Sequence, residues 1–287
     1  MGPPTNLLAL ATLMAMATGC AGGASTPQPG SSSPGRATHA VPRLVCDHTR
    51  AKPGSKVQVG VRFQIEPGWH LYWNGRNDSG YAPLLTLRAP VGYTVGSWRW
   101  PAPRRLEQPG GLVDHIYEGT VMLTTEVTLP ATARPGDAFS MSFRGEWLAC
   151  RSACEAEQGQ GELRVAIGEA RTNGTLAAEF SRTVGQIPLP WPLASDMEAS
   201  TEGEAAVFRV PGARRLEFYP GEDCAQVADI LRDGAGSGST LRVRIAGAGP
   251  VRGVLRVEPG EGARAACFAI DIPGPPREQE TPGQPAP

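Results

Sequence analysis

The strongest constraint on the fold is a ten-residue run in which apolar and polar side chains alternate. Between Lys56 and Ile65 every second residue is Val, Phe or Ile, and the residues between them are Lys, Gln, Gly or Arg. A period of two places alternate side chains on opposite faces of an extended strand, so one face is buried and the other meets solvent. The same alternation returns from Phe139 to Trp147. Both runs predict antiparallel strands.

Three further runs before Gly168 are strand-like: Tyr93 to Trp100, Thr120 to Leu129, and Leu163 to Ile167. Turn signals separate the runs, as at Lys52-Pro53-Gly54, and the chain's 36 Gly and 28 Pro favour many turns over long helices. Short strands at such spacing predict an all-β fold built around a β-sandwich.

The pattern changes after Gly168. A short helix is predicted from Thr175 to Val184, and the proline-rich run that follows cannot continue it, so residues 169–195 are interpreted as a linker. Residues 196–272 are predicted to form a second, smaller strand-rich domain with one helical candidate, Cys224 to Arg232. Its strand candidates are Ala206 to Val210, Arg214 to Tyr219, Leu241 to Ile245, Val251 to Val257, and Ala265 to Ile272. Residues 273–287 are expected to be a disordered proline-rich tail.

The start of the chain is typical of an export signal. The apolar run from Leu7 to Ala17 is shorter than the roughly 20 residues that a membrane-spanning helix needs. It leads into Cys20 through small residues, similar to a bacterial lipobox, so residues 1–20 are interpreted as a lipoprotein signal peptide with lipidation at Cys20. Ordinary secretion and a structural Cys20 are the alternatives. Residues 21–40 are interpreted as a flexible tether.

This interpretation places the protein in the bacterial cell envelope, facing the periplasm, and held by a lipid anchor to the outer rather than the inner membrane. The net charge of -1 gives no electrostatic reason to expect nucleic acid, or any membrane contact besides the anchor. The sequence holds no nucleophile-elbow, phosphate-loop or zinc-protease motif, so hydrolysis and nucleotide binding are not indicated and no cofactor is expected.

Two cysteines, Cys150 and Cys154, follow the second alternating run. A disulfide requires Cα atoms about 4.4 to 6.8 Å apart, whereas four residues of strand span about 13 Å. The two cysteines can therefore pair only if Arg151 to Ala153 turns. Redox exchange, a loop-closing disulfide and a metal site are three open interpretations of the pair.

The remaining cysteines suggest different roles. Cys224 and Cys267 both lie in the second strand-rich block and are predicted to form a structural disulfide. Cys46 is then an unpaired candidate, either reactive or simply buried. Core packing is the favoured interpretation of five aromatic residues of the first block: Trp69, Tyr72, Trp73, Trp98 and Trp100. His70 and His115 are considered as soft metal ligands, but their spacing matches no known ligand pattern, so no metal is predicted.

Four motifs point to a family: Gly68 to Trp73, Trp100 to Pro103, Tyr117 to Gly119, and Trp147 to Cys154. In order and spacing, they resemble the N-terminal periplasmic domain of DsbD-type thiol:disulfide interchange proteins. The nearest branch is the one that includes the suppressor-of-copper-sensitivity B proteins. The resemblance covers residues 41–168.

The resemblance implies an immunoglobulin-like sandwich in which Cys150 and Cys154 are the catalytic redox pair. Tyr72, Trp73 and Tyr117 become candidate shielding or neighbouring groups. One departure is that Glu155 and Ala156 follow the second cysteine, where the family often has Ile-Pro.

The function implied is a thiol-disulfide exchange module, a possible protein-disulfide reductase component that relays reducing equivalents to envelope disulfide or thioredoxin-like proteins. No membrane domain or thioredoxin-like Cys-x-x-Cys occurs in the sequence. The electron donor is therefore expected to be membrane-embedded and on a separate polypeptide. The alternatives are a non-catalytic binding or scaffold lipoprotein and a copper-handling protein.

Overall fold

The computed structural model describes residues 38–191, 196–260 and 264–275. The predicted signal peptide, the predicted lipidation site at Cys20 and nearly all of the predicted tether lie outside these residues, as does most of the predicted tail. The described residues belong to one compact unit, Thr38–Pro287, so the predicted boundary between two domains stays a prediction. No helix among the described residues is long and apolar enough to cross a membrane.

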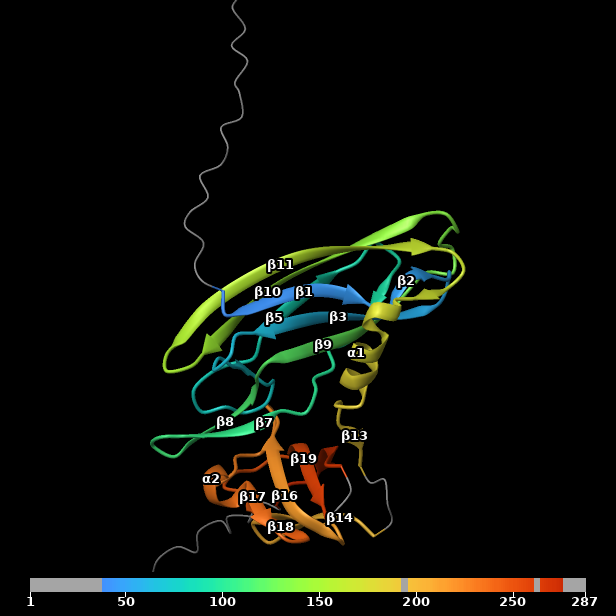
Figure 1. Ribbon diagram of the computed structural model, residues 1–287. Coiled ribbons are helices and arrows are strands. Elements are labelled where there is room, and N and C mark those ends of the chain that lie inside the picture. Colours follow the sequence, from blue (N-terminus) through green and yellow to red (C-terminus); the bar gives the residue numbers. More distant parts are fainter. Residues whose placement is uncertain (1–37, 192–195, 261–263, 276–287) are drawn as a thin grey trace, which may run out of the picture. The chain divides into compact units, whose positions relative to one another are not determined.

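Two facing sheets build the sandwich that the alternating runs predict (Figure 1). The first sheet has the strand order β1 (Ala40–Cys46), β3 (Lys56–Ile65), β9 (Thr120–Thr128) and β6 (Thr94–Val95). The second has the order β12 (Arg171–Thr172), β2 (His48–Ala51), β11 (Cys154–Ile167), β10 (Ala138–Cys150) and β5 (Leu84–Arg88). The predicted all-β, immunoglobulin-like fold class is confirmed.

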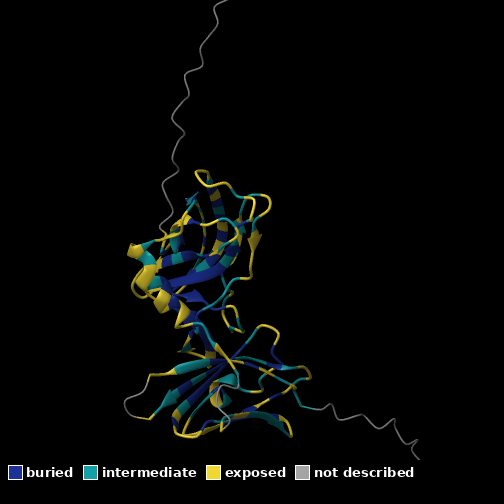
Figure 2. Cartoon of the chain, turned by 90° about the vertical axis from the view of Figure 1, so that its right-hand side faces the viewer, coloured by how far each residue is buried: buried dark blue, intermediate teal, exposed yellow. Residues whose placement is uncertain are grey.

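The core lies between the two sheets and is filled by the apolar members of the alternating runs, drawn dark blue in Figure 2. On β3 the five apolar side chains are at most 2% exposed. Opposite them, Trp147 of β10 is fully buried and meets Phe63 edge-on with ring centroids 4.9 Å apart. Each such side chain contributes roughly 1.5–3 kcal/mol by leaving water, so the alternation is the main determinant of this layer.

Strands β10 and β11 form one long hairpin whose register runs from Ala138 opposite Ala166 to Cys150 opposite Cys154. The turn is Arg151 to Ala153, as the disulfide geometry requires. The predicted strand from Leu163 to Ile167 is correct but much too short. Inward positions of β11 include Gly159 and Gly161, which leave space for the rings of β10, so this half of the strand carries no apolar alternation.

A third, smaller sheet beside the sandwich has the order β4 (Leu71–Tyr72), β8 (Leu112–Tyr117) and β7 (Arg104–Gln108). The β7–β8 hairpin was not predicted. The strand predicted from Tyr93 to Trp100 is wrong beyond Thr94–Val95. After Val95 the backbone is hydrogen-bonded to β9 only at Gly96 and at Arg99. These isolated bonds do not continue the strand pairing of Thr94–Val95.

The helix α1 (Gly174–Val184) confirms the predicted helix and lies against the first sheet. Its Phe180 packs on Val45 and Met122, and its Glu179 accepts a hydrogen bond from Arg62 at 2.5 Å. The short β13 (Leu189–Pro190) then pairs with the second strand-rich block, which leaves the linker role of this segment a prediction.

The second block contains all five predicted strands in two sheets. One sheet has the order β13, β20 (Ala266–Ile272), β19 (Val251–Pro259), β16 (Ala213–Pro220) and β17 (Ala235–Ser237). The other has the order β14 (Glu198–Glu202), β15 (Ala205–Arg209) and β18 (Thr240–Arg244).

The helix predicted from Cys224 to Arg232 is wrong except at its end, where α2 (Ile230–Asp233) forms. Backbone N–H groups of this segment bind carbonyls outside it. Ala225 donates to Pro250, and Ala228 donates to Arg244. These bonds to neighbouring strands replace the helical ones.

Candidate functional site

Cys150 and Cys154 form a disulfide with an S–S distance of 2.00 Å and Cα atoms 4.1 Å apart. Cys150 ends β10 and Cys154 begins β11, so the bond closes the tip of the long hairpin. Within the turn, the Arg151 N–H donates to the Ala153 carbonyl at 3.0 Å. Cys150 is 2% exposed, whereas Cys154 is an exposed residue. The two cysteine residues therefore differ in how far each is exposed to solvent.

The buried cysteine is fixed by its backbone. The His70 N–H donates to the Cys150 carbonyl at 2.9 Å, and the Cys150 N–H donates to the His70 carbonyl at 3.0 Å. The Cys150 side chain packs in a small apolar cluster with Tyr72 and Ile116. These contacts join the end of β10 to β4 and β8, so the third sheet supports the disulfide.

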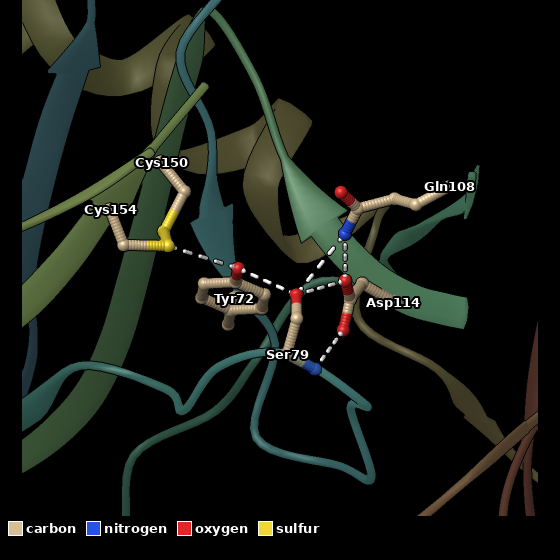
Figure 3. Close-up of a disulfide and its surroundings, with 6 residues drawn as sticks. All are labelled: Tyr72, Ser79, Gln108, Asp114, Cys150 and Cys154. Carbon is tan, nitrogen blue, oxygen red and sulfur yellow. Dashed lines mark hydrogen bonds between the residues drawn. A yellow bond between two sulfur atoms is a disulfide. The ribbon is translucent and has the colours of Figure 1, made fainter. Parts of the chain in front are cut away.

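A chain of hydrogen-bonding side chains leads away from the exposed cysteine (Figure 3). The Tyr72 hydroxyl oxygen lies 3.6 Å from the Cys154 Sγ and 3.1 Å from the Ser79 Oγ. Ser79 in turn contacts Asp114 Oδ2 at 2.5 Å and accepts from Gln108 Nε2 at 3.1 Å. Tyr72 is thus the link between the disulfide and a polar network.

Asp114 is the centre of that network and is fully buried. Its Oδ1 accepts from the backbone N–H groups of Asp78 and Ser79 at 2.9 and 3.0 Å. Its Oδ2 accepts from the Ser79 hydroxyl and from Gln108 Nε2. Four donors satisfy a buried carboxylate in its ionised form, which is the condition under which such a group is tolerated.

The turn beside the disulfide carries a stack of rings and charge. The Arg151 guanidinium lies 5.0 Å from the ring centroid of Trp69, and His39 stacks on Trp69 with centroids 3.5 Å apart. His39 also binds Glu66 at 2.5 Å and lies 3.7 Å from Glu155. The stack gives the turn a defined conformation next to the exposed cysteine.

The three predicted neighbours of the pair lie in different places. Tyr72 contacts both cysteines, whereas Trp73 and Tyr117 belong to the main core of the sandwich. The Tyr117 hydroxyl donates to the Pro101 carbonyl at 2.6 Å, and full burial raises its pKa well above the usual value. A shielding role for Trp73 and Tyr117 stays a prediction.

His70 and His115 are both buried. Burial lowers the pKa of His70, and burial lowers the pKa of His115 to about 4. The His115 Nδ1 lies 2.8 Å from the Arg76 carbonyl, to which it donates. The described ranges of the chain hold no group of three or more His, Cys, Asp or Glu side chains able to bind a metal ion.

The predicted disulfide between Cys224 and Cys267 is wrong, because both residues are free. Cys267 alternates on β20 with Phe268 and Ile270, so its side chain faces away from the core cluster that contains Cys224. The thiol of Cys46 is also free and buried, as one interpretation of it proposed.

Burial also governs the acidity of these three thiols. It raises the pKa of Cys46 to about 12, that of Cys267 to about 11 and that of Cys224 above its usual value. Thiolates are the reactive form, so these three groups are weak nucleophiles at neutral pH.

Sequence reasoning missed the partners of Tyr72, namely Ser79, Gln108 and Asp114. One signal was present. Asp114 interrupts the apolar run from Leu112 to Tyr117, and a carboxylate in a buried strand needs dedicated donors. Ser79 and Gln108 lie on polar segments and carry no such signal.

Comparison with protein families shows what this sandwich is similar to. Residues 44–165 match the family described as thiol:disulfide interchange protein DsbD, N-terminal. This part of the sandwich is similar to a DsbD N-terminal domain. The resemblance inferred from the four motifs is thereby confirmed, with bounds a few residues inside those expected.

Solved structures extend the comparison. The N-terminal periplasmic domain of ScsB from Proteus mirabilis matches with a TM-score of 0.55 at 14% identity, over 82% of this chain and 94% of that chain. The fold similarity therefore reaches beyond the DsbD N-terminal domain into the second strand-rich block.

A weaker match joins the chain to the reduced DsbD N-terminal domain from Neisseria meningitidis. It has a TM-score of 0.26 at 15% identity and covers 47% of this chain and 90% of that chain. No curated protein is similar enough in sequence to count as a match.

Proposed function

We propose that the protein is an envelope thiol-disulfide exchange module that relays reducing equivalents through Cys150 and Cys154. One observation carries the proposal: a domain similar to the DsbD N-terminal domain presents a disulfide whose two cysteine residues are unequally exposed, Cys154 exposed and Cys150 buried.

In the proposed mechanism the exposed cysteine, Cys154, reacts in the first step. A donor thiolate attacks the Cys154 sulfur, the Cys150–Cys154 bond breaks, and Cys150 takes up the electron pair and a proton. A second donor thiol then attacks the donor's own sulfur in the mixed disulfide and releases Cys154 as a thiol. Two electrons have moved, the donor has become a disulfide, and the reverse sequence reduces an acceptor.

The partners follow from this chemistry. The donor is proposed to be a membrane-embedded dithiol protein on a separate polypeptide, and the acceptors are envelope disulfide or thioredoxin-like proteins. The relative from Proteus mirabilis is a periplasmic domain, which supports a periplasmic location for this chain. A lipid anchor at Cys20 in the outer membrane is part of the same proposal.

A trapping experiment tests which sulfur exchanges. Cys150→Ala leaves the exposed thiol, and Cys154→Ala leaves the buried one, with Cys46, Cys224 and Cys267 as the same background in both. After incubation with oxidised glutathione, the Cys150→Ala protein is expected to form a mixed disulfide at Cys154 at least tenfold faster than the Cys154→Ala protein does at Cys150. Equal rates, or faster reaction at Cys150, would overturn the proposal.

A further inference from the structure

The protons of the Tyr72 network can be assigned from donor and acceptor inventories. Ser79 Oγ and Asp114 Oδ2 lie 2.5 Å apart, a distance that requires a proton between two oxygens. A carboxylate has no proton to give, so the single Ser79 proton points at Asp114. The Ser79 oxygen therefore only accepts from its other neighbours.

The next proton follows. Tyr72 lies 3.1 Å from Ser79 Oγ, which has become an acceptor, so the Tyr72 hydroxyl donates to Ser79. Burial raises the pKa of Tyr72, which keeps the phenol protonated with one proton only. With that proton directed at Ser79, the side of the oxygen facing Cys154 Sγ, 3.6 Å away, carries a lone pair.

We propose that Asp114, acting through Ser79, orients the Tyr72 hydroxyl as an acceptor toward Cys154, so that the reduced protein holds Cys154 as a thiol. A thiol donates its S–H to the lone pair, whereas a thiolate is repelled by it. Asp114 and Ser79 are positioning residues, and Tyr72 is the group that meets the reacting sulfur. The inference rests on the proposed function, since Cys154 is a free thiol only when the pair is reduced.

The consequence is that Cys154 is held in its less reactive thiol form. Cys154 is accessible and would react with stray oxidants as a thiolate, because thiol-disulfide exchange and oxidation both proceed through that form. A docking partner that supplies a donor to the sulfur, or that turns Tyr72 away from Ser79, releases the constraint at the moment of transfer.

Other charged groups near Cys154 are the same in every variant. Asp114→Asn alone removes a charge, which also acts on His70 and Tyr72. Arg151 and Glu155 flank Cys154 on the hairpin, and His39 lies against Glu155. His70 precedes β4 and meets the Tyr72 ring edge-on. It is neutral near pH 7, because burial lowers its pKa. Glu118 and Arg104 act on His70 with opposite sign.

Two substitutions reverse the network in different ways. Ser79→Ala removes the acceptor of the Tyr72 proton, and that proton then turns to the Cys154 sulfur. Ser79 is an exposed residue, so we expect the variant to fold. Asp114→Asn keeps Oδ1 for the two backbone amides and places an N–H donor where Oδ2 accepts from Ser79 and from Gln108 Nε2. The Gln108 amide can turn its Oε1 toward that donor. The Ser79 oxygen then accepts from the amide introduced at position 114, so the Ser79 proton points at Tyr72. The Tyr72 proton is thereby directed to Cys154.

The experiment measures alkylation of Cys154 by iodoacetamide as a function of pH, followed by peptide mass spectrometry. Every variant carries Cys150→Ala, so Cys154 is a free thiol whether or not the pair exchanges electrons. Failure of the glutathione trapping and failure of this test are therefore distinguishable.

With Ser79→Ala and with Asp114→Asn, alkylation at pH 7 is expected to rise about tenfold, the effect of one hydrogen bond to a thiolate, and the profile shifts to lower pH. Adding Tyr72→Phe should abolish both increases relative to Tyr72→Phe alone. Ser140→Ala, at an exposed serine of β10, is the matched control and should leave the rate unchanged.

Two results would overturn the inference. One is a folded Ser79→Ala protein with a rate within twofold of its parent. The other is an acceleration that persists in the Tyr72→Phe background, because the effect would then be a change of charge or exposure and not of proton orientation. Unchanged near-UV circular dichroism establishes that each variant is folded.

Discussion

At the scale of single residues, two buried carboxylates organise the end of the sandwich that holds the disulfide. Asp114 orders the Tyr72 network. Glu157 on β11 accepts from the His39 and Ala40 N–H groups and, at 2.8 Å, from Trp147 Nε1. A buried N–H or O–H group that has no acceptor costs free energy, because it has lost its hydrogen bonds to water. Each carboxylate therefore holds the several backbone and side-chain donors around it in place.

Glu157→Gln is expected to destabilise the protein by about 1–3 kcal/mol. The amide offers one acceptor oxygen, so its NH2 group faces either Trp147 Nε1 or the His39 N–H, and a donor then meets a donor. Urea unfolding measures the change. Glu146→Gln, at an exposed position on β10, is the control and should stay within about 0.5 kcal/mol of the parent. Equal stability of both variants would contradict the prediction.

His115 gives a second prediction, in the pH dependence of stability. Its pKa is lowered to about 4 by burial, while the unfolded chain titrates near 6.5. Between those values the unfolded state binds the extra proton, so this group lowers the free energy of unfolding as pH falls from 6.5 to 4. From pH 7 to pH 5 the loss is about 2 kcal/mol.

Urea unfolding of the parent and of His115→Gln at both pH values checks that sign. His115 Nε2 has no hydrogen-bond partner among the described residues, and its Nδ1 binds Arg76, a bond that the Gln amide can replace. The variant should lose clearly less stability than the parent between pH 7 and pH 5. An identical loss in both would show that His115 is not the titrating group.

Residue identities predicted the cysteine pair and Tyr72, but not the rest of the site. The motif around Cys150 and the aromatic run around Tyr72 are local in sequence. Ser79 and Gln108 reach the site only because β4, β7 and β8 pair, and that hairpin has a weak periodic signal. Long-range pairing is therefore what the sequence did not reveal.

At the scale of elements, alternation predicted a strand correctly where its inward residues are apolar and its outward residues are mostly polar along the whole length. β3 has the bounds expected, because each of its inward positions is Val, Phe or Ile. The predicted length of β11 was too short, because two of its inward positions are Gly159 and Gly161. The rings of β10 occupy the space that larger side chains would need there. A Cβ at Gly159 would lie 2.8 Å from the Trp147 ring and 2.8 Å from Pro42.

Gly159→Ala is therefore expected to destabilise the protein by about 1–3 kcal/mol, although alanine is ordinarily the better residue in a strand. Gln160→Ala, on the outward face of the same strand, should change stability by less than about 0.5 kcal/mol. Thermal unfolding of both variants measures this. A stabilised Gly159→Ala protein would mean that the Trp147 ring yields at low cost.

At the scale of the whole molecule, the five cysteines within the described ranges fall into two chemical classes. Cys150 and Cys154 are bonded at a hairpin tip, and Cys46, Cys224 and Cys267 are free thiols held protonated by burial. The disulfide predicted for the second block is wrong because Cys267 alternates with the inward Phe268 and Ile270, and its side chain therefore faces away from Cys224.

Alkylation of the denatured but unreduced protein should label those three thiols and leave Cys150 and Cys154 unlabelled until a reductant is added. Peptide mass spectrometry reads both steps. Protection of Cys224 and Cys267 in the first step would contradict the arrangement of the second block.

The proposed function requires the Cys150–Cys154 bond to be a reversible redox couple and not a fixed structural disulfide. The most direct measurement equilibrates the native protein with glutathione mixtures of increasing reducing power and reads the oxidation state of that peptide by mass spectrometry. A reversible transition between disulfide and dithiol, the same from either direction and with the fold retained, is the predicted result. A disulfide that stays intact in excess strong reductant would contradict it.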